Sequence, residues 1–401
     1  MRKNGVNREL TEIDGGVCAP SGFYATAIRC GFSKVASDNE DLGLIWTKRR
    51  FPAAFVSTDT ANVGACVALS QKHVRSGMAS AVIINGGVAN GYGEEADQLA
   101  ENVSRIFANR LKTDRNDFIL ITAGDLGEKL DIGQFENGAD TLAKVVKGMP
   151  SDSLAVARVI TGRVDARHLA CSFQIGDIAC KIGAVFSGYL PTDNAVETLR
   201  CVLTTDVNIS SEMLQKALKT AANEHFYALG GAVYSPNDCV CIMASGAAEN
   251  WKITENNGDY QKFVHALCSF ADKICRKIAR DGQGKSFVCK VIGAKSKNVA
   301  RETAKMMTTA LPIRSAVAKR KVSIQALLNV ILGGAEKIPY DKLSITLRST
   351  LGTFVAYEEK QVQPVLREVE EYIFSGNEIE LVIDLKDGNY SAVAYGCSTK
   401  I

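Results

Sequence analysis

Residues Ala81–Gly87 read AVIINGG, and this stretch decides the fold class. Its first five residues form a short apolar run, which is typical of a buried strand, and its two glycines predict a turn directly afterwards. Residues 94–111 place apolar side chains on one face and acidic residues in the first turn, which predicts an amphipathic helix. A second buried strand is predicted over 118–122, with Gly124 in the turn that follows. Strand, glycine turn and helix alternate, and this predicts an α/β or α+β protein with buried sheets.

The second half of the chain repeats this alternation. We predict helices over 211–229, 261–280 and 298–311, and strands over 239–243 and 287–292. The last of these helices is expected to stop before Pro312, because a residue that precedes proline disfavours the helical conformation. Residues 381–384 and 391–395 are predicted to form a hairpin around Asp387-Gly388, a common turn pair.

The composition is typical of a soluble globular protein that can build its own core. Of 401 residues, 46% are hydrophobic and 23% are charged, and the length suits two domains or one α/β body with a smaller lobe. The net charge of +3 comes without a long basic stripe, so we expect no nucleic-acid partner and no membrane binding. No apolar run approaches the roughly 18 residues of a membrane span. The polar N-terminus lacks a signal-peptide core, so we expect a cytoplasmic protein.

Twelve cysteines are present in the chain. None form a C-x-x-C pair, only four histidines accompany them, and zinc-site spacing is absent. Most lie inside apolar runs, so we expect reduced, buried thiols that act as small hydrophobic side chains. We expect no metal and no cofactor.

Two features of the sequence, taken without any family resemblance, suggest catalytic chemistry. The strand-to-glycine turns at 85–87 and 122–124 expose backbone N–H groups that could stabilise an oxyanion, although a plain tight turn is commoner. Residues 197–206, ETLRCVLTTD, contain threonines. A threonine can act as an acyl-accepting nucleophile without a histidine if peptide cleavage frees its own α-amine as the base. The alternative is that the threonine is only a β-branched structural residue in a strand or at the start of a helix. On chemistry alone this structural role is favoured over a nucleophile. His225 falls in a predicted helix and is interpreted as a packing or surface histidine.

Nine short motifs, in order along nearly the whole chain, resemble those of the ornithine acetyltransferases, the bifunctional glutamate N-acetyltransferases of arginine biosynthesis. The motifs are GGVCAPSGF (15–23), DLGLI (41–45), NGGVANG (85–91), TAGDLG (122–127), LTTD (203–206), ND (237–238), ASG (244–246), RDGQG (280–284) and AYGC (394–397). The resemblance implies a layered sheet-and-helix sandwich of the ornithine acetyltransferase and DmpA-like fold, with a smaller C-terminal lobe.

The resemblance also implies a two-step acetyl transfer after self-cleavage between Glu197 and Thr198. Cleavage would give an N-terminal (alpha) fragment, 1–197, with the oxyanion turns, and a C-terminal (beta) fragment, 198–401, that begins with the nucleophile. Thr198 would attack N-acetylornithine, hold the acetyl group as an ester and pass it to glutamate. The oxyanion would be held at the turn that matches Ala123-Gly124. Two copies of each fragment would form a heterotetramer.

Several residues depart from the family pattern at this site. Glu197 stands in place of alanine, Ala123 in place of the oxyanion threonine, and Gln283 in place of a glutamate. The family's substrate lysine has no counterpart in 184–188. Its Met-Thr-Thr-Asp motif survives only as ITGR (160–163). By this resemblance Thr161 and Gln283 are the expected substrate-binding residues.

A missing cation could be replaced by Arg163 or Arg200. The departures leave two alternatives to the acetyltransferase reading. One is a degenerate family member that keeps the fold without the reaction. The other is an N-terminal-threonine amidase or aminopeptidase, which needs no glutamate site.

Overall fold

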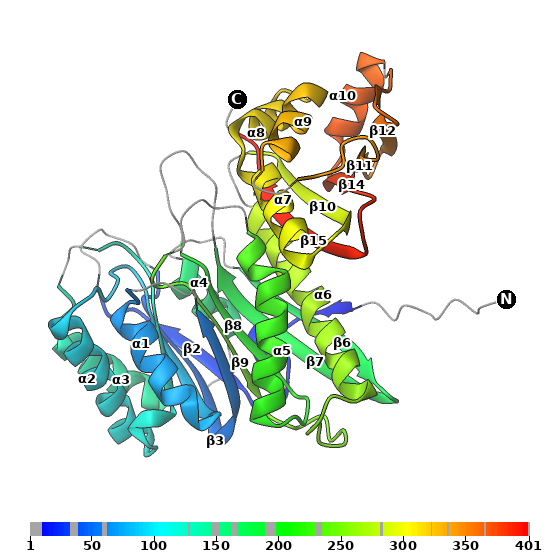
Figure 1. The fold of residues 1–401 in the computed structure, drawn as a ribbon. Coiled ribbons are helices and arrows are strands. Elements are labelled where there is room, and N and C mark those ends of the chain that lie inside the picture. Colours follow the sequence, from blue (N-terminus) through cyan, green and yellow to red (C-terminus); the bar gives the residue numbers. More distant parts are fainter. Residues whose placement is uncertain are drawn as a thin grey trace. The chain divides into compact units, whose positions relative to one another are not determined.

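The computed structural model describes residues 10–32, 39–57, 62–126, 129–145, 152–161, 167–188, 198–229, 235–280, 284–321, 323–334, 337–364 and 366–399. The chain divides into two compact units (Figure 1). Unit 1 comprises Met1–Gly188, Thr198–Ala221 and Tyr234–Phe270, and unit 2 comprises Tyr189–Glu197, Ala222–Val233 and Ala271–Ile401. None of the helices in the described ranges combines the length and apolar character needed to span a membrane.

Unit 1 is built on a nine-stranded sheet. Its strands follow the order β1-β6-β7-β8-β9-β3-β4-β5, and β2 pairs with β3. The strands are Thr11–Ile13 (β1), Tyr24–Ile28 (β2), Leu42–Ser57 (β3), Met78–Asn85 (β4), Phe118–Thr122 (β5), His168–Ile175 (β6), Ile178–Ser187 (β7), Arg200–Thr205 (β8) and Cys239–Ala244 (β9). The pairs β4–β5 and β8–β9 are parallel. The carboxyl ends of β4 and β5 therefore lie together, and so do the amino ends of β8 and β9.

Helices cover the sheet of unit 1. They are Ala65–His73 (α1), Glu94–Leu111 (α2), Ile132–Val145 (α3), Ser153–Thr161 (α4), Ser211–Glu224 (α5) and Gly258–Arg280 (α6), and the last two begin in this unit. Figure 1 shows α5 and α6 across the strands β6 to β9. One apolar core joins Ile84 and Ile121 to Val202 and Cys241 around Val156 of α4. Side chains of β4, β5, β8 and β9 meet Val156 in this core, so α4 packs on the face of the sheet that these strands share.

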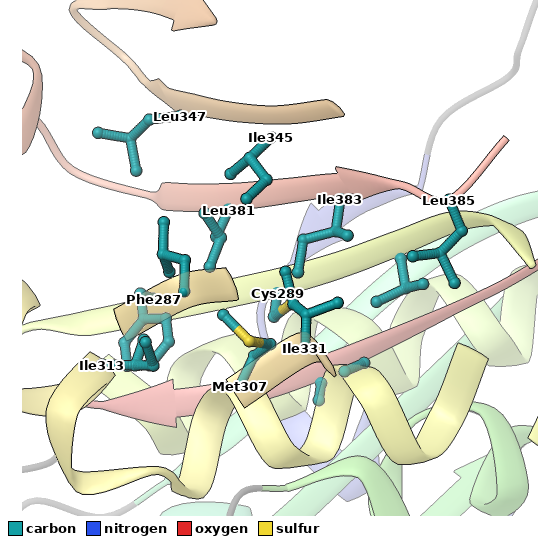
Figure 2. Packing of buried hydrophobic residues seen from close by; sticks show 14 of the residues in the cluster. Phe287, Cys289, Met307, Ile313, Ile331, Ile345, Leu347, Leu381, Ile383 and Leu385 are labelled. Atoms are coloured by element: carbon teal, nitrogen blue, oxygen red, sulfur yellow. The ribbon is translucent and has the colours of Figure 1, made fainter. Parts of the chain in front are cut away.

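Unit 2 is built on a six-stranded sheet in the order β13-β12-β11-β14-β10-β15. Its strands are Ser286–Ala294 (β10), Ser344–Ser349 (β11), Gly352–Glu358 (β12), Gln361–Val362 (β13), Ile379–Asp384 (β14) and Tyr390–Cys397 (β15), and its helices are Lys297–Thr309 (α7), Leu311–Ala318 (α8), Ile324–Leu332 (α9) and Arg367–Ser375 (α10). Met307 of α7 and Ile331 of α9 pack in one core with Cys289 of β10 and Ile383 of β14 (Figure 2). These alternating strands and helices confirm the predicted α/β class.

Local patterning predicted the individual elements well. The helix predicted over 94–111 is α2, and the strand predicted over 118–122 is β5, each with the predicted bounds. The predicted helix 211–229 ends earlier, at Glu224, and a 3-10 turn follows over Phe226–Ala228. The helix predicted over 298–311 ends at Thr309, before Pro312 as expected. Pro312 then opens α8, because the first turn of a helix does not need the missing N–H.

The predicted hairpin of 381–384 and 391–395 is wrong. Strand β10 lies between β14 and β15, parallel to the first and antiparallel to the second. Leu381 and Ala394 both pair with Cys289 of β10, on its two opposite edges. A turn signal indicates that the chain reverses between two strands. It cannot show that a third strand from elsewhere in the sequence pairs between them.

The compact units and the predicted fragments have different boundaries. Thr198–Ala221 and Tyr234–Phe270 belong to the predicted fragment 198–401, yet they lie in unit 1. Strand β8, near the start of that fragment, pairs with β7 of the fragment 1–197. A chain cut before Thr198 would therefore leave the two fragments joined through one sheet. The cut itself remains a prediction.

Candidate functional site

Thr198 lies two residues before β8 and is 8% exposed. Its hydroxyl donates a hydrogen bond of 3.0 Å to Oγ of Ser235. Its carbonyl accepts a longer bond of 3.5 Å from the hydroxyl of Ser187, at the end of β7. The side chain is therefore oriented by a polar partner. Glu197, the residue on the other side of the predicted cleavage site, lies outside the described residues.

Asp238 fixes the backbone on both sides of this contact. One oxygen of its carboxylate accepts the amide of Leu199 at 2.7 Å, and the other accepts the amide of Ser235 at 2.9 Å. Asp238 is 1% exposed, and a buried carboxylate is stable only when such donors replace water. The parallel pairing of Arg200 with Cys239 places this carboxylate at the amino ends of β8 and β9. The Asp238 side chain therefore fixes the backbone next to Thr198 and at Ser235 relative to each other.

The two predicted glycine turns pack directly on each other. They follow β4 and β5, whose last residues, Asn85 and Thr122, are paired. Gly124 has a φ of +115°, and a Cβ on it would lie 2.2 Å from the carbonyl carbon of Gly87. Only glycine fits this close approach. The amide of Asp125 also donates to the carbonyl of Gly87 at 3.2 Å, so the two turns form one rigid unit.

Ala123 and Gly124, the two predicted oxyanion residues, differ in backbone hydrogen bonding and in exposure. The amide of Ala123 donates to the carbonyl of Asn85 at 2.7 Å, and that N–H is therefore engaged within the turn. The side chain of Ala123 is buried. Gly124 has a positive-φ backbone that glycine adopts without strain, and Gly124 and the two residues after it are exposed. The oxyanion role of Ala123 and Gly124 remains a prediction.

The amino end of α1 connects the glycine turns to the Thr198 region. Gly64 donates its amide to the carbonyl of Pro236 at 3.0 Å, next to Ser235. Ala65 donates its amide to Gly91 at 3.4 Å, in the loop that follows β4. A Cβ on Gly64 would lie 1.8 Å from Oδ1 of Asn237, so this approach also needs glycine. The loops after β4 and before β9 thus meet at one helix end.

The substrate-binding predictions have mixed outcomes. Thr161 is the last residue of α4, and its hydroxyl donates to the carbonyl of Ala157 at 2.9 Å, a bond within the helix. The carbonyl of Val159, also near the end of α4, lies 2.7 Å from where a Cβ of Gly86 would be, so this helix end lies beside the first glycine turn. Gln283 and Arg163 lie outside the described residues.

Arg200 brings a cation to the amino end of β8. Its side chain is only 8% exposed, two residues after Thr198. Burial raises the pKa of the nearby Cys239 thiol to about 12, and Arg200 offsets this only partly. Burial also raises the pKa of the Cys66 thiol to about 11. These thiols stay protonated near neutral pH, so neither is a competing nucleophile.

All twelve cysteines are free, and most are buried, as predicted. Among the described residues there is no group of three or more histidine, cysteine or acidic side chains placed to hold a metal ion.

A second, partly buried polar cluster lies in unit 2. The hydroxyl of Tyr395 donates to Asp272 at 2.7 Å and lies 2.7 Å from Nδ1 of His225. Arg276 contacts the other carboxylate oxygen of Asp272 at 2.8 Å and Glu380 at 3.0 Å. Tyr395 is 1% exposed, so its hydroxyl depends on these partners. We assign the cluster a structural role, which agrees with the interpretation of His225 as a packing residue.

Sequence reasoning missed Ser235 as a contact of Thr198. The residues lie 37 positions apart, and no spacing rule links them. The one usable signal was the Asn237-Asp238 motif, which immediately follows Ser235-Pro236 and precedes β9.

Comparison with known proteins gives a family match over most of the chain. The model of the ArgJ family matches residues 24–400. The chain is 25% identical to the arginine biosynthesis bifunctional protein ArgJ of Oceanobacillus iheyensis, over 96% of this chain and 93% of that protein. It is 29% identical to the glutamate N-acetyltransferase of Methanothermobacter thermautotrophicus, over 97% of this chain and 95% of that protein. A crystal structure of the ArgJ protein from Bacillus halodurans covers 49% of this chain and 92% of its own, at 26% identity and a TM-score of 0.45.

Proposed function

Because this chain belongs to the ArgJ family, we propose that it moves an acetyl group from N-acetylornithine to glutamate in arginine biosynthesis. The chain is an enzyme of the acyltransferase class, in keeping with relatives named as glutamate N-acetyltransferase and ArgJ. One observation carries the specific proposal: the hydroxyl of Thr198 lies 3.0 Å from a second hydroxyl, on a backbone fixed by Asp238. A nucleophile needs this kind of defined position.

The reaction begins with self-cleavage before Thr198. Cleavage frees the α-amine of Thr198, which then serves as the base. In the first transfer, Oγ of Thr198 bonds to the acetyl carbon while its proton passes to the α-amine. The tetrahedral intermediate collapses, the bond to the ornithine nitrogen breaks, and that nitrogen takes the proton. The acetyl ester on Thr198 is then attacked by the amine of glutamate through the same steps in reverse.

The tetrahedral intermediate carries a negative oxygen that needs preorganised donors. We assign this role to the turn at Ala123-Gly124, and chiefly to the Gly124 side of it, because the Ala123 amide donates to Asn85. Loss of one such donor typically raises the barrier by about 2.7–4 kcal/mol. The packing of this turn on Gly87 supports the assignment, since rigid donors cost no rearrangement during the reaction.

Both substrates carry a carboxylate, which calls for a cation in the pocket. Arg200, buried and two residues from Thr198, is our candidate among the described residues. Arg163, which lies outside the described residues, is the second candidate. Thr161 and Gln283 are the proposed polar contacts to the substrate. We propose that two fragments of each kind assemble as a heterotetramer in the cytoplasm.

A second candidate function is amide hydrolysis by the same N-terminal threonine. One observation favours it: residues 184–187, where the family has its substrate lysine, form the fully buried end of β7. A pocket without that lysine has less to hold the second carboxylate of a transfer reaction. Water would then replace glutamate as the acceptor. A member of the family without activity would keep the fold and show neither reaction.

The test supplies purified protein with N-acetylornithine, with and without glutamate. The acetyltransferase reading predicts ornithine release that depends on glutamate, with N-acetylglutamate formed in equal amount. Ornithine release without glutamate, accompanied by acetate, would instead support the amidase. Thr198→Ala is the control and should abolish either reaction. If wild type and control are equally inactive with both substrates, the acetyltransferase proposal is wrong.

A further inference from the structure

The side chain of Asn237 is buried, and its oxygen lacks a partner. The residue is 6% exposed, and Oδ1 receives no hydrogen bond from any described residue. An oxygen in this state costs free energy, because it has lost water without gaining a donor. Oδ1 lies 1.8 Å from the position of a Cβ on Gly64, the residue directly before α1. The oxygen therefore faces the amino end of this helix and lacks an N–H donor there.

The amino end of α1 lacks good acceptors for its own N–H groups. The amides in the first turn of a helix have no partner inside the helix. Gly64 is extended, no side chain of the described residues caps this end, and the first turn holds no acidic residue. The amide of Ala65 makes only a long bond of 3.4 Å, to the carbonyl of Gly91. A helix end of this kind favours a negatively charged ligand.

Both features lie close to the proposed nucleophile. The amide of Asn237 donates to Oγ of Ser235 at 3.2 Å, and the hydroxyl of Thr198 donates to the same atom at 3.0 Å. The carbonyl of Pro236 accepts the amide of Gly64 at 3.0 Å, which ties the helix end to this turn. Oδ1 of Asn237, the end of α1 and Thr198 are therefore close enough to contact one small molecule.

We propose that Asn237 and the amino end of α1 bind the head group of an N-acyl α-amino acid, the class of compound that donates the acyl group. This inference rests on the proposed function. The α-carboxylate lies against the amides in the first turn of α1, and the amide N–H of the substrate donates to Oδ1 of Asn237. Asn237 is thus a specificity-determining residue. The subsite selects the head group and leaves the substrate's side chain to the rest of the pocket.

This class of ligand matches the two features in charge and in connectivity. In an N-acyl α-amino acid, the carboxylate and the N–H are attached to the same carbon, and the acyl carbon is bonded to the nitrogen. A molecule held by its carboxylate and its N–H therefore has its acyl carbon oriented for attack by Oγ of Thr198. N-acetylornithine and the product N-acetylglutamate share this head group, so one subsite serves both halves of the transfer.

The neighbouring charges are compatible with an anion. Asp238 follows Asn237, but its two carboxylate oxygens already accept the amides of Leu199 and Ser235. Arg200, two residues after Thr198, adds a positive charge at the amino end of β8. The helix end therefore acts in addition to this cation.

The first test asks whether Asn237 recognises the N–H of the donor. It measures the reverse of the proposed transfer, from N-acetylglutamate to ornithine, and repeats it with 2-acetoxyglutarate, in which an ester oxygen replaces the N–H. Asn237→Leu removes the acceptor at similar size. Asn208→Leu is the matched control, because Asn208 lies beyond the opposite end of β8 and donates to the carbonyl of Asn250 at 3.2 Å. Each protein carries a specific protease site before Thr198, so that the α-amine is exposed in all of them.

We expect Asn237→Leu to lower kcat/KM for N-acetylglutamate about 10- to 100-fold, because the N–H of the substrate would be buried without an acceptor, and to change the value for 2-acetoxyglutarate less than about threefold. Asn208→Leu should affect the two donors equally. A purely structural role of Asn237 would lower both values by the same factor, and that result would overturn the assignment.

The second test concerns the carboxylate. Val63→Asp adds a negative charge directly before Gly64, and Val63→Asn is its neutral control of the same size. We expect Val63→Asp to have a kcat/KM for N-acetylglutamate about 3- to 10-fold below that of Val63→Asn, the size of one charge effect at a helix end. N-acetylisoglutamine, whose α-carboxylate is replaced by a neutral amide, should not distinguish the two variants. Equal values with N-acetylglutamate would overturn the role of α1.

The outcomes separate this subsite from the proposed function. Equal effects of Asn237→Leu on both donors, with acetyl transfer intact, would reject the subsite and keep the function. If the wild type transfers no acetyl group, the proposed function is wrong, and binding decides about the subsite. Titration calorimetry with N-acetylglutamate should then show an affinity about 10- to 100-fold lower for Asn237→Leu than for wild type. Equal affinities, or no binding to wild type, would reject the subsite as well.

Discussion

The carboxylate of Asp238 holds the amide of Leu199 at 2.7 Å, one residue after Thr198. Its other oxygen holds Ser235, so Asp238→Asn should affect both ends of the site. An asparagine has only one acceptor oxygen, and its NH2 group would face the second amide. We expect the free energy of unfolding to fall by about 1–3 kcal/mol, the cost of an unsatisfied buried donor. Urea unfolding measures this.

The matched control is Asp177→Asn, at an exposed position in the turn between β6 and β7. It should change the free energy of unfolding by less than about 0.5 kcal/mol. Equal effects of the two variants would show that the Asp238 bonds do not contribute to stability.

Gly124 should tolerate no side chain. In Gly124→Ala the new Cβ would lie 2.2 Å from the backbone of Gly87, at a φ of +115°. We expect a loss of roughly 3 kcal/mol or more from the clash and the strain together. Gly93→Ala is the control, because it has a φ of +88° but open space around its Cβ. It should lose only the strain of this glycine-favoured backbone, about 1–3 kcal/mol, without the added clash. Equal losses, measured by urea unfolding, would contradict the packing of the two turns.

The sequence predicted local elements better than their pairing. Strand β5 and helix α2 could be predicted because their own residues carry the apolar pattern and the turn signals. The insertion of β10 between β14 and β15 could not, since it depends on contacts between distant parts of the chain. The same limit applies at the site. Thr198 and the glycine turns were visible in the sequence, but the bond from Thr198 to Ser235 spans 37 positions.

Two histidines, the buried His73 and the half-buried His225, should make stability depend on pH. Burial lowers the pKa of His73 and of His225 below the ordinary 6.5. The unfolded chain therefore binds a proton first as the pH falls. The stabilisation is complete above pH 6.5 and is lost as the pH drops from 6.5 toward the folded-state pKa. Each histidine adds a slope of at most about 1.4 kcal/mol per pH unit.

The test compares wild type with the double variant His73→Asn, His225→Asn in urea at pH 7.5, 6.5 and 5.5. Asparagine keeps a polar atom near the Nδ1 position but does not titrate. Burial raises the pKa of Asp117 and of Asp206, and these shifts act in the opposite direction at lower pH. The effect of Asp206 cancels in this comparison, whereas His73 is one of the groups that act on Asp117. The stability difference between the two proteins should change with pH. A constant difference would show that neither histidine is linked to folding.

Most thiols should be unreactive in the folded protein. Nine of the twelve cysteines are buried, and only Cys18, Cys30 and Cys268 are partly exposed. Burial raises the pKa of Cys239 to about 12 and that of Cys241 further above its ordinary value. A thiol reagent at pH 8 should therefore modify at most three sites before unfolding and all twelve afterwards. Peptide mapping that finds labelled Cys239 or Cys241 in the folded protein would contradict this.

The central claim is that Thr198 becomes an N-terminal nucleophile, and the mass of the purified chain tests it most directly. Under denaturing conditions, wild type should give two fragments of 197 and 204 residues, which together make the 401 residues of the chain. The second fragment should begin at Thr198, and Thr198→Ala should give one uncut chain. A single 401-residue species from the wild type would contradict the account, because Thr198 would then have no free amine to act as its base.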